Sequence, residues 1–212
     1  LNQVNVRPTV GLTFAATLRS ILRQDPDIIM IGEIRETDTL DIAVKAALTG
    51  HLVLSSLHTT TAAGSVVRMM NMGVEPFLIC SSVVAIIGQR LLRRICPRCK
   101  EQYSLAEPMA KKLGLWQKGR ADLVLFRGRG CASCQQSGYW GRIGISEILV
   151  LNAAVRDEIL SRAGEGRIKQ AGRQGGMITM REDGMAKARE GQTTLEEVLR
   201  VTAPDEDLPA AG

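Results

Sequence analysis

Stretches with helical spacing of apolar residues alternate with short, continuously apolar runs over the first part of the chain. The helical stretches cover residues 11–24, 37–48 and 61–72. The apolar runs cover residues 28–31 and 52–54. A run without polar interruptions is typical of a strand that is covered on both faces of a parallel sheet. The alternation therefore predicts an α/β fold in which helices pack on the faces of a sheet.

The hydrophobic pattern changes after Cys96. Residues up to about 141 are rich in Gly, Arg and Cys and show little periodicity. Short helical patterns return beyond Ile145, at residues 153–162, 167–174, 180–189 and 194–201. We therefore divide the chain into an α/β segment, a cysteine-containing segment, a mostly helical segment and a tail expected to be disordered, with the bounds 1–95, 96–141, 142–202 and 203–212.

Four of the five cysteines form two Cys-x-x-Cys pairs that are separated by 31 residues, Cys96 with Cys99 and Cys131 with Cys134. Each pair can place two thiolates on one metal ion through a tight turn, and two such turns complete a tetrahedron. We interpret the four as a Zn²⁺ site with a structural role, because four protein ligands leave no open position. Two unrelated redox pairs, or simply buried thiols, are the alternative. Cys80 lies in an apolar helical stretch and is interpreted as a core residue.

An acidic residue follows the first apolar run. Ligands of α/β sheets bind outside the carboxyl ends of the strands, and Glu33 stands just past such an end, after Gly32. Its carboxylate could polarise a water that attacks a γ-phosphate, or hold a Mg²⁺-bound water. Gly32 occupies the place where many ATPases carry a magnesium-binding Asp. Taken alone, the segment fits a solvated loop acid equally well.

The two histidines, His51 and His58, bracket the second apolar run. If the sheet is parallel, His58 emerges at the same edge as Glu33, where its imidazole could hydrogen-bond a γ-phosphate. A histidine with a purely structural role is the alternative. The hydroxyl-rich residues 59–61 are also what a helix cap requires.

Taken together, these segments resemble the ATPases of type II secretion and type IV pilus assembly. Residues 25–36 are similar to the Walker B box of that family, residues 49–59 to its histidine box, and the cysteine pairs to its zinc-binding subdomain. Further matching segments are residues 89–91, 141–147 and 191–198. The likeness runs in the family's order from Gln3 to about Thr202.

The resemblance implies the C-terminal half of a RecA-like P-loop NTPase core, followed by the tetracysteine zinc subdomain and a mostly helical subdomain. It makes Glu33 the Walker B glutamate and His58 the histidine-box residue, with Gly32, Arg35 and Thr59 bordering the nucleotide. It also implies ATP and Mg²⁺ at that site, a homohexamer, and a cytoplasmic location at the inner membrane against a platform of membrane components. Type II secretion and pilus extension both fit, whereas the retraction ATPases of the family lack the tetracysteine site.

One expected motif is absent from these residues. No Gly-x-x-x-x-Gly-Lys-Ser/Thr occurs, so the loop whose backbone amides would cradle the phosphates is missing. The arginine fingers that the family carries are likewise expected upstream. We therefore expect this chain alone to have negligible ATPase activity and weak affinity for nucleotide.

Charge and composition raise a second possible function, nucleic-acid binding. The net charge of +5 and the tetracysteine site would suit a zinc-ribbon protein that binds nucleic acid. The aromatic content of 3% and the lack of a basic stripe argue against it, and we expect no nucleic-acid partner. The local cluster Arg90, Arg93, Arg94 and Arg98 is interpreted as charge compensation for the zinc site. The alternative is that the cluster contacts anionic lipid. Liposome co-sedimentation that shows no preference for anionic lipid would exclude this alternative.

Overall fold

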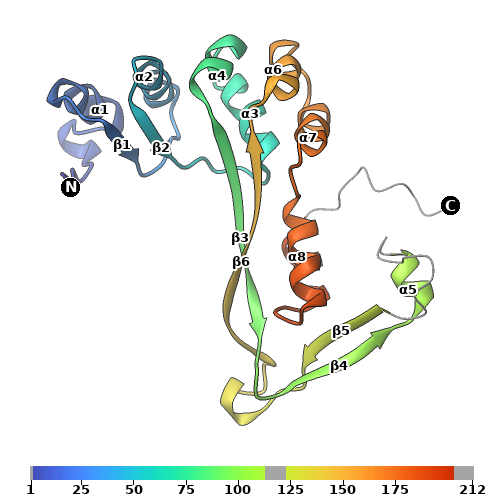
Figure 1. The fold of residues 1–212 in the computed structure, drawn as a ribbon. Coiled ribbons are helices and arrows are strands. Elements are labelled where there is room, and N and C mark those ends of the chain that lie inside the picture. Colours follow the sequence, from blue (N-terminus) through green and yellow to red (C-terminus); the bar gives the residue numbers. More distant parts are fainter. Residues whose placement is uncertain (1, 113–122, 203–212) are drawn as a thin grey trace. The chain divides into compact units, whose positions relative to one another are not determined.

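The computed structural model describes residues 2–112 and 123–202 (Figure 1). The chain divides into two compact units. Unit 1 consists of Leu1–Ile87 and Ile148–Met177, and unit 2 of Gly88–Glu147 and Ile178–Gly212. The chain passes from one unit to the other within two strands, β3 (Ala85–Ile95) and β6 (Tyr139–Val150), which are hydrogen-bonded neighbours. The four-part division along the sequence stays a prediction beside this grouping, and its tail, 203–212, lies outside the described residues.

Unit 1 contains a parallel pair of strands. β1 (Ile28–Ile31) pairs with β2 (Leu52–Ser55), so that Ile28 lies opposite Leu52 and Ile31 opposite Ser55. α2 (Thr37–Leu48) connects the two strands, as a crossover between parallel strands requires. The predicted α/β arrangement with parallel strands is confirmed.

The core of unit 1 joins residues that are far apart in the sequence. Ala15, Ile29 and Val66 share one hydrophobic cluster with Leu149 and Ile168. The helices that contribute to this unit, besides α2, are α1 (Phe14–Ile21), α3 (Ala62–Asn71), α4 (Pro76–Ser82), α6 (Ala153–Leu160) and α7 (Glu165–Gln174). Cys80, which was predicted to be a core residue, lies in α4, is half-buried and packs against this cluster from its edge.

The prediction that both strands are covered on both faces was wrong. Ile29 and Ile31 of β1 are buried, but Ile28 and Met30 are 62% and 81% exposed. Leu52 and Leu54 of β2 are about half exposed as well. The reason is that the core cluster packs on the face that carries Ile29 and Ile31, and within 2–112 and 123–202 no element covers the opposite face.

Unit 2 has a core of its own, in which Leu92, Leu125 and Ile145 meet Met180 and Val198. β4 (Lys100–Leu105) pairs in antiparallel fashion with β5 (Leu123–Gly128). The helical elements of the unit are α5 (Glu107–Lys112), the 3₁₀ turn η3 (Ala132–Cys134), α8 (Met180–Arg189) and α9 (Leu195–Val201). The sequence showed little periodicity here because β4 alternates exposed polar with half-buried residues instead of apolar with polar ones.

The three helices predicted last along the sequence begin and end close to their predicted bounds. α7, α8 and α9 occupy Glu165–Gln174, Met180–Arg189 and Leu195–Val201. Within the described part of the chain, none of the helices combines the length and the apolar character that crossing a bilayer requires.

Candidate nucleotide and metal sites

The carboxyl ends of β1 and β2 are held together beyond the strands themselves. The backbone N–H of Ile34 donates to the Ser56 carbonyl at 3.0 Å, and Ser56 Oγ donates to the Gly32 carbonyl at 2.8 Å. These bonds bring the loop after β1 beside the loop after β2. Glu33 and His58, one from each loop, therefore emerge at the same edge of the sheet.

Glu33 and His58 are in direct contact. His58 Nε2 lies 2.9 Å from Glu33 Oε2, and Arg35 Nε lies 2.9 Å from the same oxygen. The side chain of Glu33 is 27% exposed, whereas those of His58 and Arg35 are 73% and 69% exposed. The expected juxtaposition of the acid and the imidazole is present in the structure; their catalytic roles stay predictions.

The surroundings of Glu33 favour its charged form. The hydrogen bond from His58 is the main cause that lowers the pKa of Glu33 below its ordinary value, and Arg35 acts in the same direction against partial desolvation. Glu33 is therefore a carboxylate at neutral pH. It can accept a hydrogen bond from a water molecule or a proton from it.

The other two residues expected to border the nucleotide, Gly32 and Thr59, differ in the contacts that they make within the protein. A Cβ atom placed on Gly32 would meet no atom within 4 Å, so the space beside Gly32 is open. Thr59 Oγ1 instead lies 2.6 Å from Ser65 Oγ and donates to the Thr61 carbonyl at 3.2 Å, at the start of α3. The structure thus brings Arg35 to Glu33, and directs the Thr59 hydroxyl toward α3.

His51 has the local environment of a structural histidine. Its Nδ1 lies 2.9 Å from the Ala46 carbonyl and 3.2 Å from Thr49 Oγ1, at the C-terminal end of α2. It precedes β2, whereas His58 follows that strand. Only one of the two histidines that the sequence offered therefore lies at the edge with Glu33.

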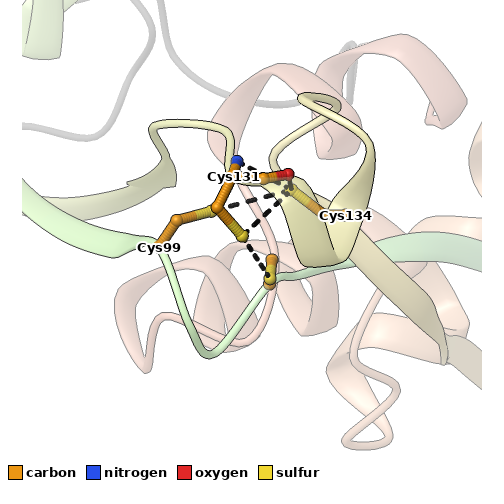
Figure 2. Close-up of side chains that lie close together, drawn as sticks. Cys99, Cys131 and Cys134 are labelled. Carbon is orange, nitrogen blue, oxygen red and sulfur yellow. Dashed lines mark hydrogen bonds between the residues drawn. The ribbon is translucent and has the colours of Figure 1, made fainter.

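The four paired cysteines meet in one place in unit 2. Cys96 and Cys99 follow β3, and Cys131 caps the short turn η3, of which Cys134 is the last residue. The four sulfur atoms all lie within 4.8 Å of one another, and Figure 2 shows Cys99, Cys131 and Cys134 pointing toward a common centre. Two separate redox pairs would not require this convergence, so the alternative of unrelated pairs is not supported.

The distances between the sulfur atoms fit a tetrahedral metal centre. Cys96 Sγ lies 3.9 Å from Cys131 Sγ, Cys99 Sγ lies 3.9 Å from Cys134 Sγ, and Cys131 and Cys134 are separated by 3.7 Å. A Zn²⁺ ion with Zn–S bonds of about 2.3 Å requires sulfur–sulfur separations of about 3.8 Å. All four are free thiols, and all but Cys131 are buried. The residues present therefore fit Zn²⁺ with four thiolate ligands.

The thiols of the centre differ in their readiness to lose a proton. Burial opposes the charge on Cys134, but the backbone N–H groups of Cys131 and Gly138, each 3.3 Å from its sulfur, outweigh it and lower its pKa to about 6. Burial raises the pKa of Cys99 to about 12. Metal binding at this centre would therefore have to release protons, as thiolate ligands generally require.

Two glycines allow the backbone segments of the metal centre to approach closely. A Cβ atom on Gly128 would lie 2.0 Å from the Gly138 carbonyl oxygen, and Gly138 has a φ of +76°. The Gly138 carbonyl also accepts a hydrogen bond from the Cys96 N–H at 2.9 Å, which ties the second cysteine pair to the first. Sequence reasoning did not single out either glycine, because their contact joins positions without a shared motif.

Part of the predicted basic cluster makes contacts within the protein. Arg98 Nη1 donates to Ser133 Oγ at 2.8 Å, between the two cysteine pairs. Arg93 lies over the ring of Tyr139 at 4.0 Å and donates to the buried carboxylate of Glu197 at 2.5 Å. These contacts support charge compensation near the metal centre for Arg98 and a packing role for Arg93.

Comparison with known proteins identifies a family that this chain matches over nearly its whole length. The family described as Type II/IV secretion system protein matches residues 1–200. The Type II secretion system ATPase E of Vibrio cholerae is 48% identical over 202 residues, 95% of this chain and 40% of that protein. The Type IV pilus assembly ATPase PilB of Thermus thermophilus is 47% identical over 202 residues, 95% of this chain and 23% of that protein.

A solved structure shares the fold. The pilus retraction motor PilT with bound ADP superposes with a TM-score of 0.64 at 26% identity, over 92% of this chain and 46% of that chain. This chain therefore spans less than half the length of each of these relatives.

Proposed function

This chain belongs to the Type II/IV secretion system protein family, and we propose that it forms part of a hexameric ATPase that powers type II protein secretion. The observation that carries the proposal is the contact between Glu33 and His58 at the carboxyl ends of two parallel strands. The identity of 48% to the ATPase E of Vibrio cholerae supports it. Hydrolysis, the hexamer and the partners are properties that we propose for the complete protein.

Type IV pilus assembly is the second candidate. The identity of 47% to PilB of Thermus thermophilus is nearly the same as that to the secretion ATPase, and the tetracysteine centre fits both functions. Pseudopilin and secretin genes beside the complete gene would favour secretion, whereas pilin and retraction genes would favour pilus assembly.

In the proposed reaction, ATP with Mg²⁺ supplies the γ-phosphoryl group and water is the nucleophile. The Glu33 carboxylate accepts a hydrogen bond from this water and orients it for attack. The His58 N–H, which donates to Glu33 in the structure, donates to a phosphate oxygen when nucleotide is bound. Arg35 offsets phosphate charge, and Gly32 and Thr59 border the nucleotide.

The roles of Glu33 and His58 can be tested by substitution in the complete ATPase. We expect Glu33→Gln to lower kcat by at least ~100-fold and His58→Ala by at least ~10-fold, because the first removes the group that orients water and the second a donor to the transition state. Asp41→Asn is the control, since Asp41 pairs with Lys45 on the exposed side of α2. Steady-state ATP hydrolysis measures the effect, and wild-type activity in Glu33→Gln would contradict the proposal.

We also propose that this chain by itself binds nucleotide weakly and does not hydrolyse it, since its residues include no Walker A loop. Titration with a fluorescent ATP analogue measures the affinity. Tight binding that depends on Mg²⁺ would contradict the proposal.

The tetracysteine centre is proposed to hold Zn²⁺ in a structural role.

The complete protein is proposed to work at the cytoplasmic side of the inner membrane, against a platform of membrane components. The names of the secretion and pilus relatives support a role beside such components. Membrane fractionation tests it: we expect the complete protein to leave the membrane fraction when the platform is deleted. Unchanged fractionation would contradict it.

A further inference from the structure

The loop that carries His58 is anchored by a residue from a distant part of unit 1. Thr61 stands at the N-cap of α3, where its Oγ1 accepts the Gly64 N–H at 2.9 Å. The same hydroxyl donates to Oε1 of Glu165, the first residue of α7. The two residues are 104 positions apart, and helices α3 and α7 pack against each other.

The Glu165 carboxylate serves the first turns of two helices. It is the acidic residue in the first turn of α7, whereas α3 has none in its own first turn. Glu165 Oε2 lies 3.3 Å from where a Cβ on Gly64 would stand, inside the first turn of α3. Negative charge stabilises the N-terminal end of a helix, so Glu165 supplies to α3 the charge that its own residues lack.

This anchor reaches His58 through a short chain of hydroxyl groups. Thr59 Oγ1 donates to the Thr61 carbonyl at 3.2 Å and accepts from Ser65 Oγ at 2.6 Å, and Ser65 Oγ lies 3.3 Å from the same carbonyl. The other end of the loop is held by Ser56, which bonds Gly32 and Ile34. His58 lies between these anchors with 73% of its side chain exposed, so the loop, and not burial, determines its position.

We propose that Glu165 is a positioning residue for His58: by holding Thr61, it keeps the loop in the conformation that places the imidazole beside Glu33. The inference rests on the proposed function, because it assigns Glu165 to the reaction in which His58 acts. Glu165 itself contacts neither Glu33 nor His58 in the structure; it acts through Thr61 and the residues that follow His58.

The test uses the complete ATPase and the Glu165→Ala variant. Because His58 is proposed to act in the transition state, kcat should fall on the order of fivefold while KM for ATP changes by less than about twofold. Glu165→Gln keeps an oxygen that accepts the Thr61 hydroxyl, so it should retain most of the activity. Arg167→Ala is the control on the same helix: Arg167 pairs with Glu158, and its removal should leave kcat unchanged.

A second background separates positioning from general damage to the fold. In His58→Ala, adding Glu165→Ala should lower kcat no further, since the residue that it positions is already absent. An equal fall in both backgrounds, or no fall in either, would overturn the inference. If His58→Ala is itself fully active, the proposed function fails, and this inference fails with it.

Hydrogen exchange gives a readout that does not depend on catalysis. We expect the amide of Gly64 to exchange on the order of tenfold faster in Glu165→Ala than in Arg167→Ala, because the cap at Thr61 loses its second partner. Unchanged exchange would show that Glu165 does not hold the loop, whatever the ATPase assay gives.

Discussion

Glu197 is an almost fully buried acid of unit 2, with 1% of its side chain exposed. Arg93 donates to it from its backbone N–H at 3.0 Å and from its guanidinium, and Arg200 donates with two nitrogens at 2.9 and 2.8 Å. Burial disfavours its charge, but these donors outweigh burial and lower its pKa from 4.5 to about 2. The folded state therefore prefers the ionised form more strongly than the unfolded chain does.

This shift predicts a pH-dependent effect of Glu197→Gln. Because the folded pKa is depressed, the charge contributes its full stability above about pH 4.5, and the contribution is lost as pH falls through about 2. We expect the substitution to lower the free energy of unfolding by about 3 kcal/mol at pH 7, and the difference from wild type to shrink as the pH approaches 2. Urea unfolding at several pH values measures it.

Glu196→Gln is the matched control for this experiment, since Glu196 precedes Glu197 on α9 and is exposed. Its substitution should change the free energy of unfolding little at any pH. A pH-independent loss in Glu197→Gln would show that packing, and not charge, carries the effect.

What could be predicted for single residues depended on whether their partners lie in one motif or far apart. The pairing of Glu33 with His58 followed from the rule that parallel strands present their carboxyl ends at one edge. Glu165 and Glu197 were not singled out as partners, because each contacts a residue 104 positions away and no local pattern signals such a contact.

Among the elements, the two cysteine-bearing turns make the strongest prediction. Cys131→Ser removes one of four converging ligands, so bound zinc should fall from about one ion per chain toward zero, and the melting temperature should drop on the order of 10 °C. Metal analysis and thermal unfolding measure these changes in parallel.

Cys80→Ser is the control for the metal site. Cys80 lies in α4 of unit 1, contacts the Arg156 carbonyl and is not one of the four converging thiols. Its variant should retain the full zinc content. Zinc retained by Cys131→Ser, or none in the wild-type protein, would contradict the assignment of the centre.

The elements themselves were predictable where apolar residues carry the pattern. β1 coincides with its predicted run, and the later helices were foreseen because their apolar spacing is regular. β4 was missed because polar side chains occupy its exposed positions and hide the alternation, and β5 because its short apolar run lies in a Gly- and Arg-rich stretch without regular spacing. The exposed face of β1 could not be predicted, because an uninterrupted apolar run has the same sequence pattern whether one face of the strand or both faces are covered.

At the scale of the whole molecule, the grouping into two units makes a prediction that the linear division does not. α8 and α9 share a core with Leu92 and Leu125, so they belong with the cysteine centre although the last cysteine precedes them by more than forty residues. Removing the metal should therefore speed hydrogen exchange in residues 180–201. Residues 153–174, which lie between in sequence but belong to unit 1, should be unaffected.

Mass spectrometry of exchanged peptides before and after chelation distinguishes the two divisions. A treatment with chelator and excess Zn²⁺ controls for effects of the chelator itself. Faster exchange across the whole of 142–202 would instead favour the linear division.

The two passages of the chain through β3 and β6 also set an order for folding during synthesis. Ile168 and Ala171 share a core cluster with Ala15 and Ile29, so this cluster cannot assemble until those residues have left the ribosome. By then all four thiols of the candidate metal centre have already emerged, while α8 and α9 have not. Unit 1 therefore stays incompletely folded on the ribosome while the first part of unit 2 is already outside it. A premature stop after Met177 would release a chain that contains the whole cluster of unit 1 described here but lacks α8 and α9 of unit 2.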